Sequence, residues 1–89
     1  MNFMKTTVLV IGTLAMFEAG AAGVDVIAHR GASAYAPENT LAAFELAVEM
    51  KAHWFELDCT MSKDGEIIVI HDDDLERTTD KTGYIRDLT

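Results

Sequence analysis

The 89-residue chain has one cysteine and one proline, and each of these scarcities limits the structures that the chain can form. Cys59 has no partner for an internal disulfide, and its place in a strand-like run is typical of a small buried apolar residue. Pro37 excludes a strand interior at that point and favours a helix entrance. Asn39 or Thr40 is the expected N-cap of that helix, and Glu38 lies where the helix dipole favours an anion.

Basic residues are also scarce. Seven Lys and Arg stand against 15 Asp and Glu, which gives a formal net charge of −8. Binding many phosphates requires clustered Lys and Arg, so this balance argues against nucleic acid as a partner. A single phosphate group remains compatible with the charge, provided that a local cation offsets the acidic field.

Long apolar runs are missing as well. The most apolar stretch, Val8–Phe17, is too short to span a bilayer, which takes about 20 residues, so no stable membrane span is predicted. It follows Lys5 and precedes small residues at 19–21, the pattern of a signal-peptidase site. Residues 1–21 are therefore predicted to be a signal peptide of a secreted or periplasmic protein, ahead of one domain at 24–89. The alternative is an ordinary first strand or helix of the fold.

An apolar content of 49% is typical of a chain that folds. Residue patterns predict a strand at Val24–His29, a helix at about Thr40–Lys51 and a strand at Trp54–Thr60. A second hairpin strand is expected at Glu66–His71, after a two-residue turn at Asp64-Gly65. Strand, helix and strand in this order predict a βαβ unit, and hence an α/β fold with a parallel sheet.

This arrangement gathers five polar residues. The expected hairpin register places Asp58 opposite His71. Parallel neighbouring strands bring their carboxyl ends to the same edge of the sheet, so His29 and Arg30 should lie beside Glu56 and Asp58. We therefore expect all five side chains to lie close together at one edge of the sheet.

The residue types suit phosphate chemistry with a metal. Glu56 and Asp58, two residues apart on one strand face, are a good start for Ca²⁺ or Mg²⁺, which take oxygen ligands. Two imidazoles suit general acid–base work because histidine titrates near neutral pH. The guanidinium of Arg30 matches two phosphate oxygens.

Other sites fit the sequence less well. The acidic stretch after His71 suggests an EF-hand loop, but Arg77 occupies the place where that loop requires glycine. Zinc is disfavoured because there is no HExxH spacing and Cys59 points to the opposite strand face. A serine hydrolase elbow would need a glycine two residues after Ser33, and none is present.

Three segments carry a family resemblance: "AHRGASAYAPENTLAAFELAVE", "WFELD" and "SKDGEIIVIHDDDLERTT". They resemble the glycerophosphodiester phosphodiesterase family of TIM-barrel enzymes. The resemblance implies hydrolysis of small-molecule glycerophosphodiesters to glycerol 3-phosphate and an alcohol, in lipid and glycerol metabolism. It also implies roles for the five residues: His29 and His71 as catalytic histidines, Arg30 as a phosphate contact, and Glu56 and Asp58 as ligands of Ca²⁺ or Mg²⁺.

Length is the departure from this family. A TIM barrel takes about 250 residues, so residues 24–89 are expected to form only the N-terminal portion of a (β/α)8-type barrel. The third metal carboxylate of the family has no counterpart here. Two alternatives stay open: a non-catalytic fragment of the domain, or the same fold with a sphingomyelinase D-like substrate. The 89-residue chain alone is expected to be inactive.

Overall fold

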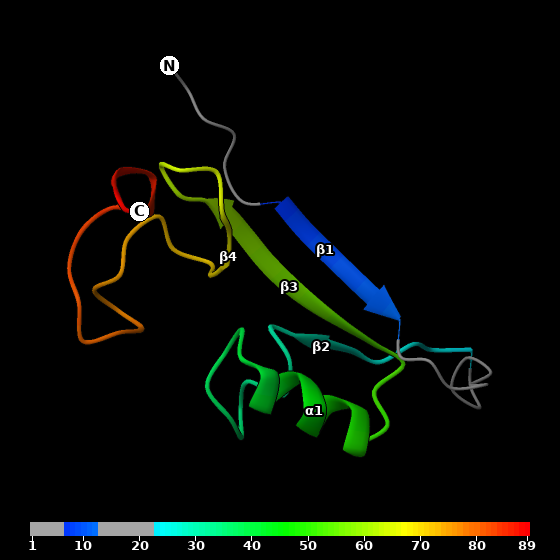
Figure 1. The fold of residues 1–89 in the computed structure, drawn as a ribbon. Coiled ribbons are helices and arrows are strands. Elements are labelled where there is room, and N and C mark those ends of the chain that lie inside the picture. The colour runs from blue at the N-terminus through cyan, green and yellow to red at the C-terminus, as the bar shows by residue number, and fades with distance from the viewer. Residues whose placement is uncertain (1–6, 13–22) are drawn as a thin grey trace.

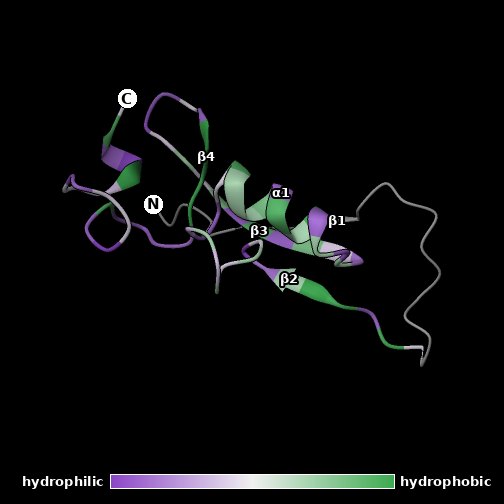
Figure 2. Cartoon of the chain, turned by 90° about the horizontal axis from the view of Figure 1, so that it is seen from below, coloured by the Kyte–Doolittle hydropathy of each residue, from purple (hydrophilic) through white to green (hydrophobic). Residues whose placement is uncertain are grey.

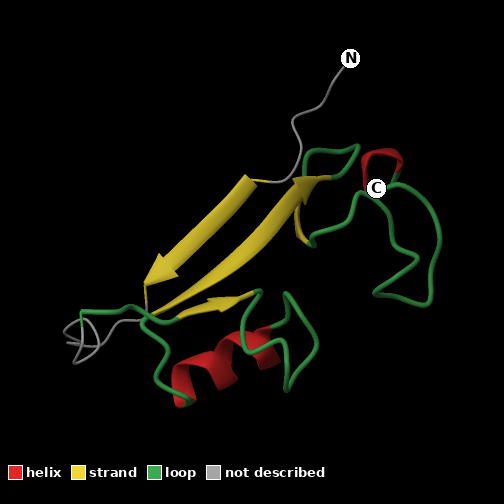
Figure 3. Ribbon diagram, turned by 180° about the vertical axis from the view of Figure 1, so that it is seen from behind, coloured by secondary structure: helices red, strands yellow, loops and turns green. Residues whose placement is uncertain are grey.

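A computed structural model describes residues 7–12 and 23–89 of the chain. Figure 1 shows the element order: β1 (Thr7–Gly12), β2 (Ile27–His29), α1 (Leu41–Glu49), β3 (Trp54–Met61) and β4 (Ile67–Val69), followed by a 3-10 turn, η1 (Ile85–Asp87). Figure 3 shows that the chain after β4 is almost entirely loop. The described part is thus a small sheet with one covering helix.

Strand β3 is the centre of the sheet, between β1 and β2. The strand β2 pairs with it in parallel, from Ile27 opposite Trp54 to His29 opposite Glu56. The α1 crossover between two parallel strands is the predicted βαβ unit, and this prediction is confirmed. Before β3, the backbone N–H of Val26 donates to His53 Nδ1 at 2.8 Å, which fixes the start of the parallel pair.

Helix α1 begins and ends with recognisable caps. The hydroxyl of Thr40 accepts a hydrogen bond from the Ala43 N–H at 3.2 Å, so Thr40 is the N-cap. Lys51 takes a left-handed conformation with φ 61°, and the Ala52 N–H donates back to the Ala47 carbonyl at 3.0 Å. This is a Schellman ending, which stops the helix two residues before the predicted limit.

The helix packs on β3 through aromatic rings. Phe44 stacks on Phe55 with ring centroids 4.8 Å apart and an interplanar angle of 24°, a favourable offset geometry. Ala43 and Ala47 on the same helix face are buried. Ala43 lies against Gly31, and its carbonyl accepts a hydrogen bond from the Ala32 N–H, so the helix holds the turn that follows β2.

The hairpin register differs by one residue from the prediction. Cys59 faces Val69 and Met61 faces Ile67, so Asp58 does not pair with His71. The cause is the turn: Gly65 adopts φ 89°, and its N–H donates to the Ser62 carbonyl at 3.1 Å. Glycine thus takes the left-handed place in a three-residue loop, not the second place of a two-residue turn.

Strands β2 and β4 are shorter than predicted, whereas β3 extends one residue beyond the predicted Thr60, to Met61. Strand β2 begins at Ile27, because the carbonyl of Val26 bonds the turn before β3. Strand β4 spans Ile67–Val69 within the predicted Glu66–His71. Each of these strands is limited by the point at which its backbone stops pairing with β3. Side-chain alternation along the sequence does not indicate that point.

The sheet is open and leaves apolar side chains uncovered. Figure 2 shows β2 as a hydrophobic strand at the margin of the molecule. Val26 and Ile27 are 54% and 52% exposed, and Tyr35 on the following loop is 73% exposed. These apolar side chains therefore lack the partners that a closed barrel would give them.

Strand β1 lies within the segment predicted as a signal peptide and runs antiparallel to β3, with Thr7 opposite Cys59. The small residues at 19–21 lie outside the described residues, so the signal peptide and its cleavage stay predictions. Within the described ranges, no helix is both long and apolar enough to cross a membrane.

Candidate active site

The carboxyl end of β2 brings His29 to Glu56. The two residues are register partners across the parallel pair, and His29 Nε2 lies 3.3 Å from Glu56 Oε1. The imidazole is 64% exposed, whereas the carboxylate is 23% exposed. A solvent-facing ring beside a half-buried carboxylate can exchange protons with a bound molecule.

A left-handed turn follows immediately. Arg30 and Gly31 have φ angles of 63° and 80°. A Cβ atom on Gly31 would lie 2.7 Å from the Ala43 backbone carbon, so only glycine fits there without displacing α1. The Ala32 N–H donates to the Ala43 carbonyl at 2.9 Å, and the Ser33 hydroxyl donates to the His29 carbonyl at 2.9 Å. The turn is thereby fastened to both helix and strand.

This turn directs the Arg30 side chain to two carboxylates. Arg30 Nε lies 3.5 Å from Asp58 Oδ2, and Nη1 donates to both oxygens of Glu38 at 3.3 and 3.4 Å. Only 19% of the side chain is exposed. Its Nε is buried without a hydrogen-bond partner among the described residues. Asp58 Oδ2 lies within ion-pair distance of this nitrogen, so the guanidinium is held between two carboxylates.

Asp58 is the most buried carboxylate of the group, with 3% of its side chain exposed. Asn39 pairs with it twice: the Asn39 amide donates to Asp58 Oδ2, and the Asp58 backbone N–H donates to Asn39 Oδ1, both at 3.2 Å. Asn39 holds φ 55°, which asparagine tolerates better than most residues. The residue before the helix cap thus fixes Asp58 on β3.

His71 follows β4 and meets a different carboxylate. Its Nδ1 lies 2.9 Å from Asp72 Oδ1. Asp72 in turn accepts two hydrogen bonds from Arg77, and Arg77 donates to both oxygens of Glu38. Because Glu38 also binds Arg30, a series of charged contacts connects His71 to the β2 turn.

These contacts shift the protonation of the acids involved. Hydrogen bonds from Arg77 hold the pKa of Glu38 below its usual value of 4.5, aided by the nearby Arg30. Hydrogen bonds from Arg77, and then from His71, lower the pKa of Asp72 well below its usual 3.8. The pKa of Arg77 rises because both carboxylates favour its charged form.

The two predicted metal ligands lie two residues apart on β3, close to the ends of β2 and β4. Their oxygen donors fit Ca²⁺ or Mg²⁺ in kind. Each carboxylate is engaged by a basic side chain, Glu56 by His29 and Asp58 by Arg30. In the described part of the chain, no three His, Cys, Asp or Glu side chains gather in a way that could hold a metal. Glu56 and Asp58 would therefore supply two carboxylate ligands to a metal ion.

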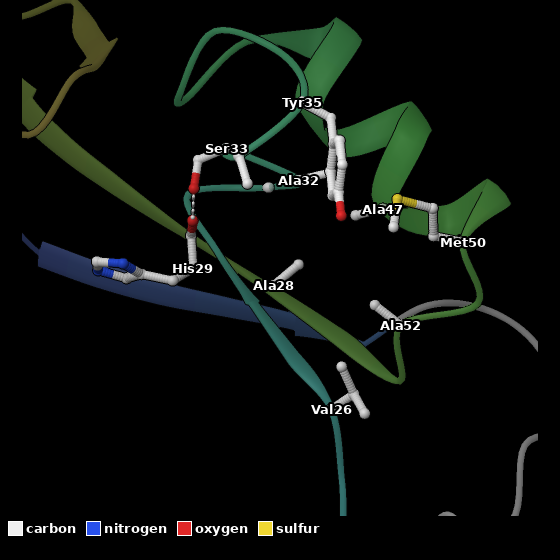
Figure 4. Close-up of a pocket in the computed structure, with 11 residues that line it drawn as sticks. Val26, Ala28, His29, Ala32, Ser33, Tyr35, Ala47, Met50 and Ala52 are labelled. Carbon is white, nitrogen blue, oxygen red and sulfur yellow. Dashed lines mark hydrogen bonds between the residues drawn. The ribbon is translucent and has the colours of Figure 1, made fainter.

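A cavity of about 250 Å³ opens on the other side of the β2 turn. Figure 4 shows its apolar wall, in which Tyr35 extends across α1 toward Ala47, while Val26 and Ala28 line the strand side. The His29 ring points away from these residues in the same view. Because His29 is one of the residues that line it, the cavity adjoins the polar cluster at the end of β2.

Comparison with known proteins places this arrangement in a family. Residues 29–89 match the profile described as "Glycerophosphoryl diester phosphodiesterase family". The chain belongs to the glycerophosphodiester phosphodiesterase family. The resemblance that the sequence motifs indicate is confirmed, and with it the assignment to the N-terminal part of a TIM-barrel domain.

Family members from several bacteria are close in sequence. The Bacillus subtilis protein YhdW is 59% identical over 64 residues, which are 72% of this chain and 26% of that protein. A glycerophosphodiester phosphodiesterase of Bacillus subtilis is 52% identical over 63 residues, 71% of this chain and 22% of the relative. The present chain spans about a quarter of the length of these relatives.

A solved family structure supports the fold. The phosphodiesterase of Oleispira antarctica, determined in complex with the product sn-glycerol-3-phosphate, superposes with a TM-score of 0.71 and 49% identity. The superposition covers 73% of this chain and 26% of that one. The open βαβ unit of this family member thus matches one part of a larger barrel.

The structure brings the predicted residues of this family member together in two pairs, His29 with Glu56 and Arg30 with Asp58. It connects His71 to them through intervening residues, not through the predicted strand pairing. The roles assigned to all five stay predictions.

Four polar residues of the cluster were not predicted as site residues: Glu38, Asn39, Asp72 and Arg77. The sequence indicates Glu38 and Asn39 as helix-entrance residues, and Arg77 only as a residue that disfavours an EF-hand loop. One signal was available. Arg77 is the only basic residue in the acidic stretch 72–80, where an ion pair is to be expected.

Proposed function

We propose that the complete protein is a glycerophosphodiester phosphodiesterase, and that this chain supplies the N-terminal part of its active site. The reaction is hydrolysis of a glycerophosphodiester to glycerol 3-phosphate and an alcohol. The predicted signal peptide adds that the enzyme acts outside the cell or in the periplasm. The names of the relatives and the product complex of the Oleispira structure support the substrate class.

One observation carries this proposal. The exposed His29 and the half-buried Arg30 stand at the carboxyl end of β2, next to Glu56 and Asp58 on the parallel neighbour β3. TIM-barrel enzymes build their active sites at this end of the strands. An imidazole, a guanidinium and two carboxylates at that place form a site for a phosphate ester.

The histidines would move protons in this reaction. One takes the proton of the attacking water or substrate hydroxyl, and the other gives a proton to the leaving alkoxide. Asp72 accepts the N–H of His71 Nδ1, so the neutral ring presents Nε2 as its basic nitrogen. The exposed ring of His29 lies at the mouth beside Glu56.

Arg30 would bind the phosphate. Its guanidinium is held between Glu38 and Asp58. A phosphate oxygen bound by this guanidinium would gain a charge-assisted hydrogen bond. Because its side chain is largely shielded from solvent, that bond would be screened less than one at the surface.

Glu56 and Asp58 would hold a divalent cation, Ca²⁺ or Mg²⁺, as two of its oxygen ligands. When bound, such a cation supplies positive charge against the phosphate oxygens. The buried Asp58 is already fixed by Asn39, as expected for a ligand that must keep its place.

The test is release of glycerol 3-phosphate from glycerophosphocholine by the complete protein encoded by the gene that carries this sequence. His29→Ala and His71→Ala should each lower kcat by roughly 10² to 10⁴-fold with little change in KM, because acid–base groups act on the transition state. His53→Asn is the matched control, since it changes the third histidine but keeps an acceptor for the Val26 N–H. Full activity in both alanine variants would reject the proposed roles.

A further inference from the structure

All three guanidinium nitrogens of Arg77 donate hydrogen bonds to two carboxylates, those of Asp72 and Glu38. Nε donates to Asp72 Oδ2 at 2.7 Å and Nη2 donates to Asp72 Oδ1 at 3.0 Å. On its other side, Nη1 donates to Glu38 Oε2 at 3.2 Å and Nη2 donates to Glu38 Oε1 at 2.5 Å. Each carboxylate is therefore bound in a two-pronged manner, the geometry in which arginine is most specific.

Both carboxylates have a second partner that belongs to the candidate active site. Asp72 faces His71 Nδ1 at 2.9 Å, and Glu38 binds Arg30 Nη1 at 3.3 Å. Arg77 is consequently the central member of a series that begins at His71 and ends at Arg30. The series joins the loop after β4 to the turn after β2, although Glu38 and Arg77 are 39 residues apart in sequence.

The geometry separates the two arginines by task. Arg30 lies against Asp58 through Nε and donates to Glu38 through Nη1, so it belongs to the candidate site itself. All three nitrogens of Arg77 are occupied by carboxylate oxygens, so it has little to offer a phosphate. Without Arg77, Glu38 and Asp72 would be neighbouring negative charges that repel each other.

We propose that Arg77 is a positioning residue for the phosphodiesterase reaction, which holds Asp72 against His71 and Glu38 against Arg30. This inference rests on the proposed function. Fixed on both oxygens by Arg77, Asp72 keeps the proton of the neutral His71 ring on Nδ1 and so directs Nε2 to the substrate. Fixed likewise, Glu38 holds the Arg30 guanidinium at one orientation.

The effect should appear in turnover more than in stability. The Arg77 side chain is 50% exposed, and ion pairs with an exposed partner add little to the free energy of unfolding. A small displacement of an acid–base group or a phosphate ligand, in contrast, can cost about a hundredfold in rate. Activity and folding are thus expected to respond differently to the same substitution.

The experiment uses Arg77→Ala and Arg77→Lys in the complete protein, with Arg86→Lys as the control. Arg86 lies over the Tyr84 ring at 4.8 Å, outside the series. Arg77→Ala should lower kcat by about 10 to 100-fold. Arg77→Lys should not restore it, because an ammonium group cannot grip two carboxylates at once. Millimolar guanidinium should restore part of the activity of Arg77→Ala, and Arg86→Lys should match the wild type.

A second readout does not depend on turnover. Nitrogen-15 NMR of the His71 ring should show the Nδ1-protonated tautomer in the wild type, and a mixture of tautomers in Arg77→Ala and Asp72→Asn. If the protein has no phosphodiesterase activity but the tautomer shift occurs, the proposed function fails and the positioning role stands. If His71→Ala abolishes turnover while Arg77→Ala leaves both kcat and the tautomer unchanged, the positioning role is overturned and the function stands.

Discussion

At the scale of single residues, Gly31 decides whether the β2 turn can lie against α1. The turn must place Arg30 beside Asp58 while its backbone touches the helix, and a Cβ on Gly31 would come within 2.7 Å of Ala43 atoms. Gly65 has a similar positive φ, yet a Cβ there would meet nothing within 4 Å. A side chain at position 65 would therefore add conformational strain alone, whereas a side chain at position 31 would add strain and a steric clash.

Gly31→Ala should destabilise the complete protein by about 2–4 kcal/mol, because backbone strain and an overpacked helix contact add. The matched control, Gly65→Ala, should lose only about 1 kcal/mol, the strain alone. Urea unfolding of both variants measures the difference. Equal losses would mean that the contact with Ala43 relaxes without cost.

At the scale of elements, ion pairs connect two loops that no strand pairing joins within residues 23–89. The loop entering α1 provides Glu38, and the loop after β4 provides Asp72 and Arg77. In the β3–β4 hairpin, the three-residue loop sets the register of the strands. Side-chain alternation alone could not set it, because a three-residue loop and a two-residue loop suit the same strand sequences. The place of His71 was consequently set by loop contacts more than by strand pairing.

Acid should loosen this loop connection. Arg77 lowers the pKa of Glu38 below 4.5 and that of Asp72 below 3.8. A group whose pKa falls on folding stabilises the fold above its usual pKa, and this contribution is lost as the pH falls toward the lowered value. The contacts should thus be intact above about pH 5 and weaken progressively below 4.5.

Amide hydrogen exchange across residues 72–79 of the complete protein, compared between neutral and acid pH, checks this expectation. In the wild type, the protection of these amides from exchange should decline as the pH falls below 4.5, the usual pKa of Glu38. In Arg77→Ala the loop should already be less protected at neutral pH and show a smaller acid response. An identical pH profile in the two proteins would assign the acid response to other carboxylates.

At the scale of the whole molecule, the chain is an open part of a barrel. It spans about a quarter of the length of its relatives, and apolar side chains such as Ile27, Tyr35 and Leu41 are more than half exposed. Two carboxylates on β3 provide too few ligands for a cation that takes six or more oxygens. Water, substrate and residues outside this chain must complete such a site, and we expect no turnover from the 89-residue chain alone.

Metal removal tests the role of the carboxylates in the complete protein. A chelator should abolish release of glycerol 3-phosphate, and added Mg²⁺ or Ca²⁺ should restore it. Glu56→Gln keeps the side-chain shape but removes the charge, so it should raise the cation concentration needed for half-maximal activity by at least about tenfold. Glu66→Gln, at the exposed end of the hairpin loop, is the control. Activity that is insensitive to the chelator would show that Glu56 and Asp58 have another task.

The sequence by itself determined the βαβ unit, the helix, the family and the place of His29 and Arg30 beside Glu56 and Asp58. Apolar periodicity and glycine placement are local signals, and parallel pairing then brings His29 to Glu56 of necessity. Only the tertiary structure decided the hairpin register, the pairing of Asn39 with Asp58, and the place of Arg77 between Glu38 and Asp72. Those depend on loop conformation and on contacts between residues far apart in sequence, which no local pattern encodes because many loop paths fit the same residues.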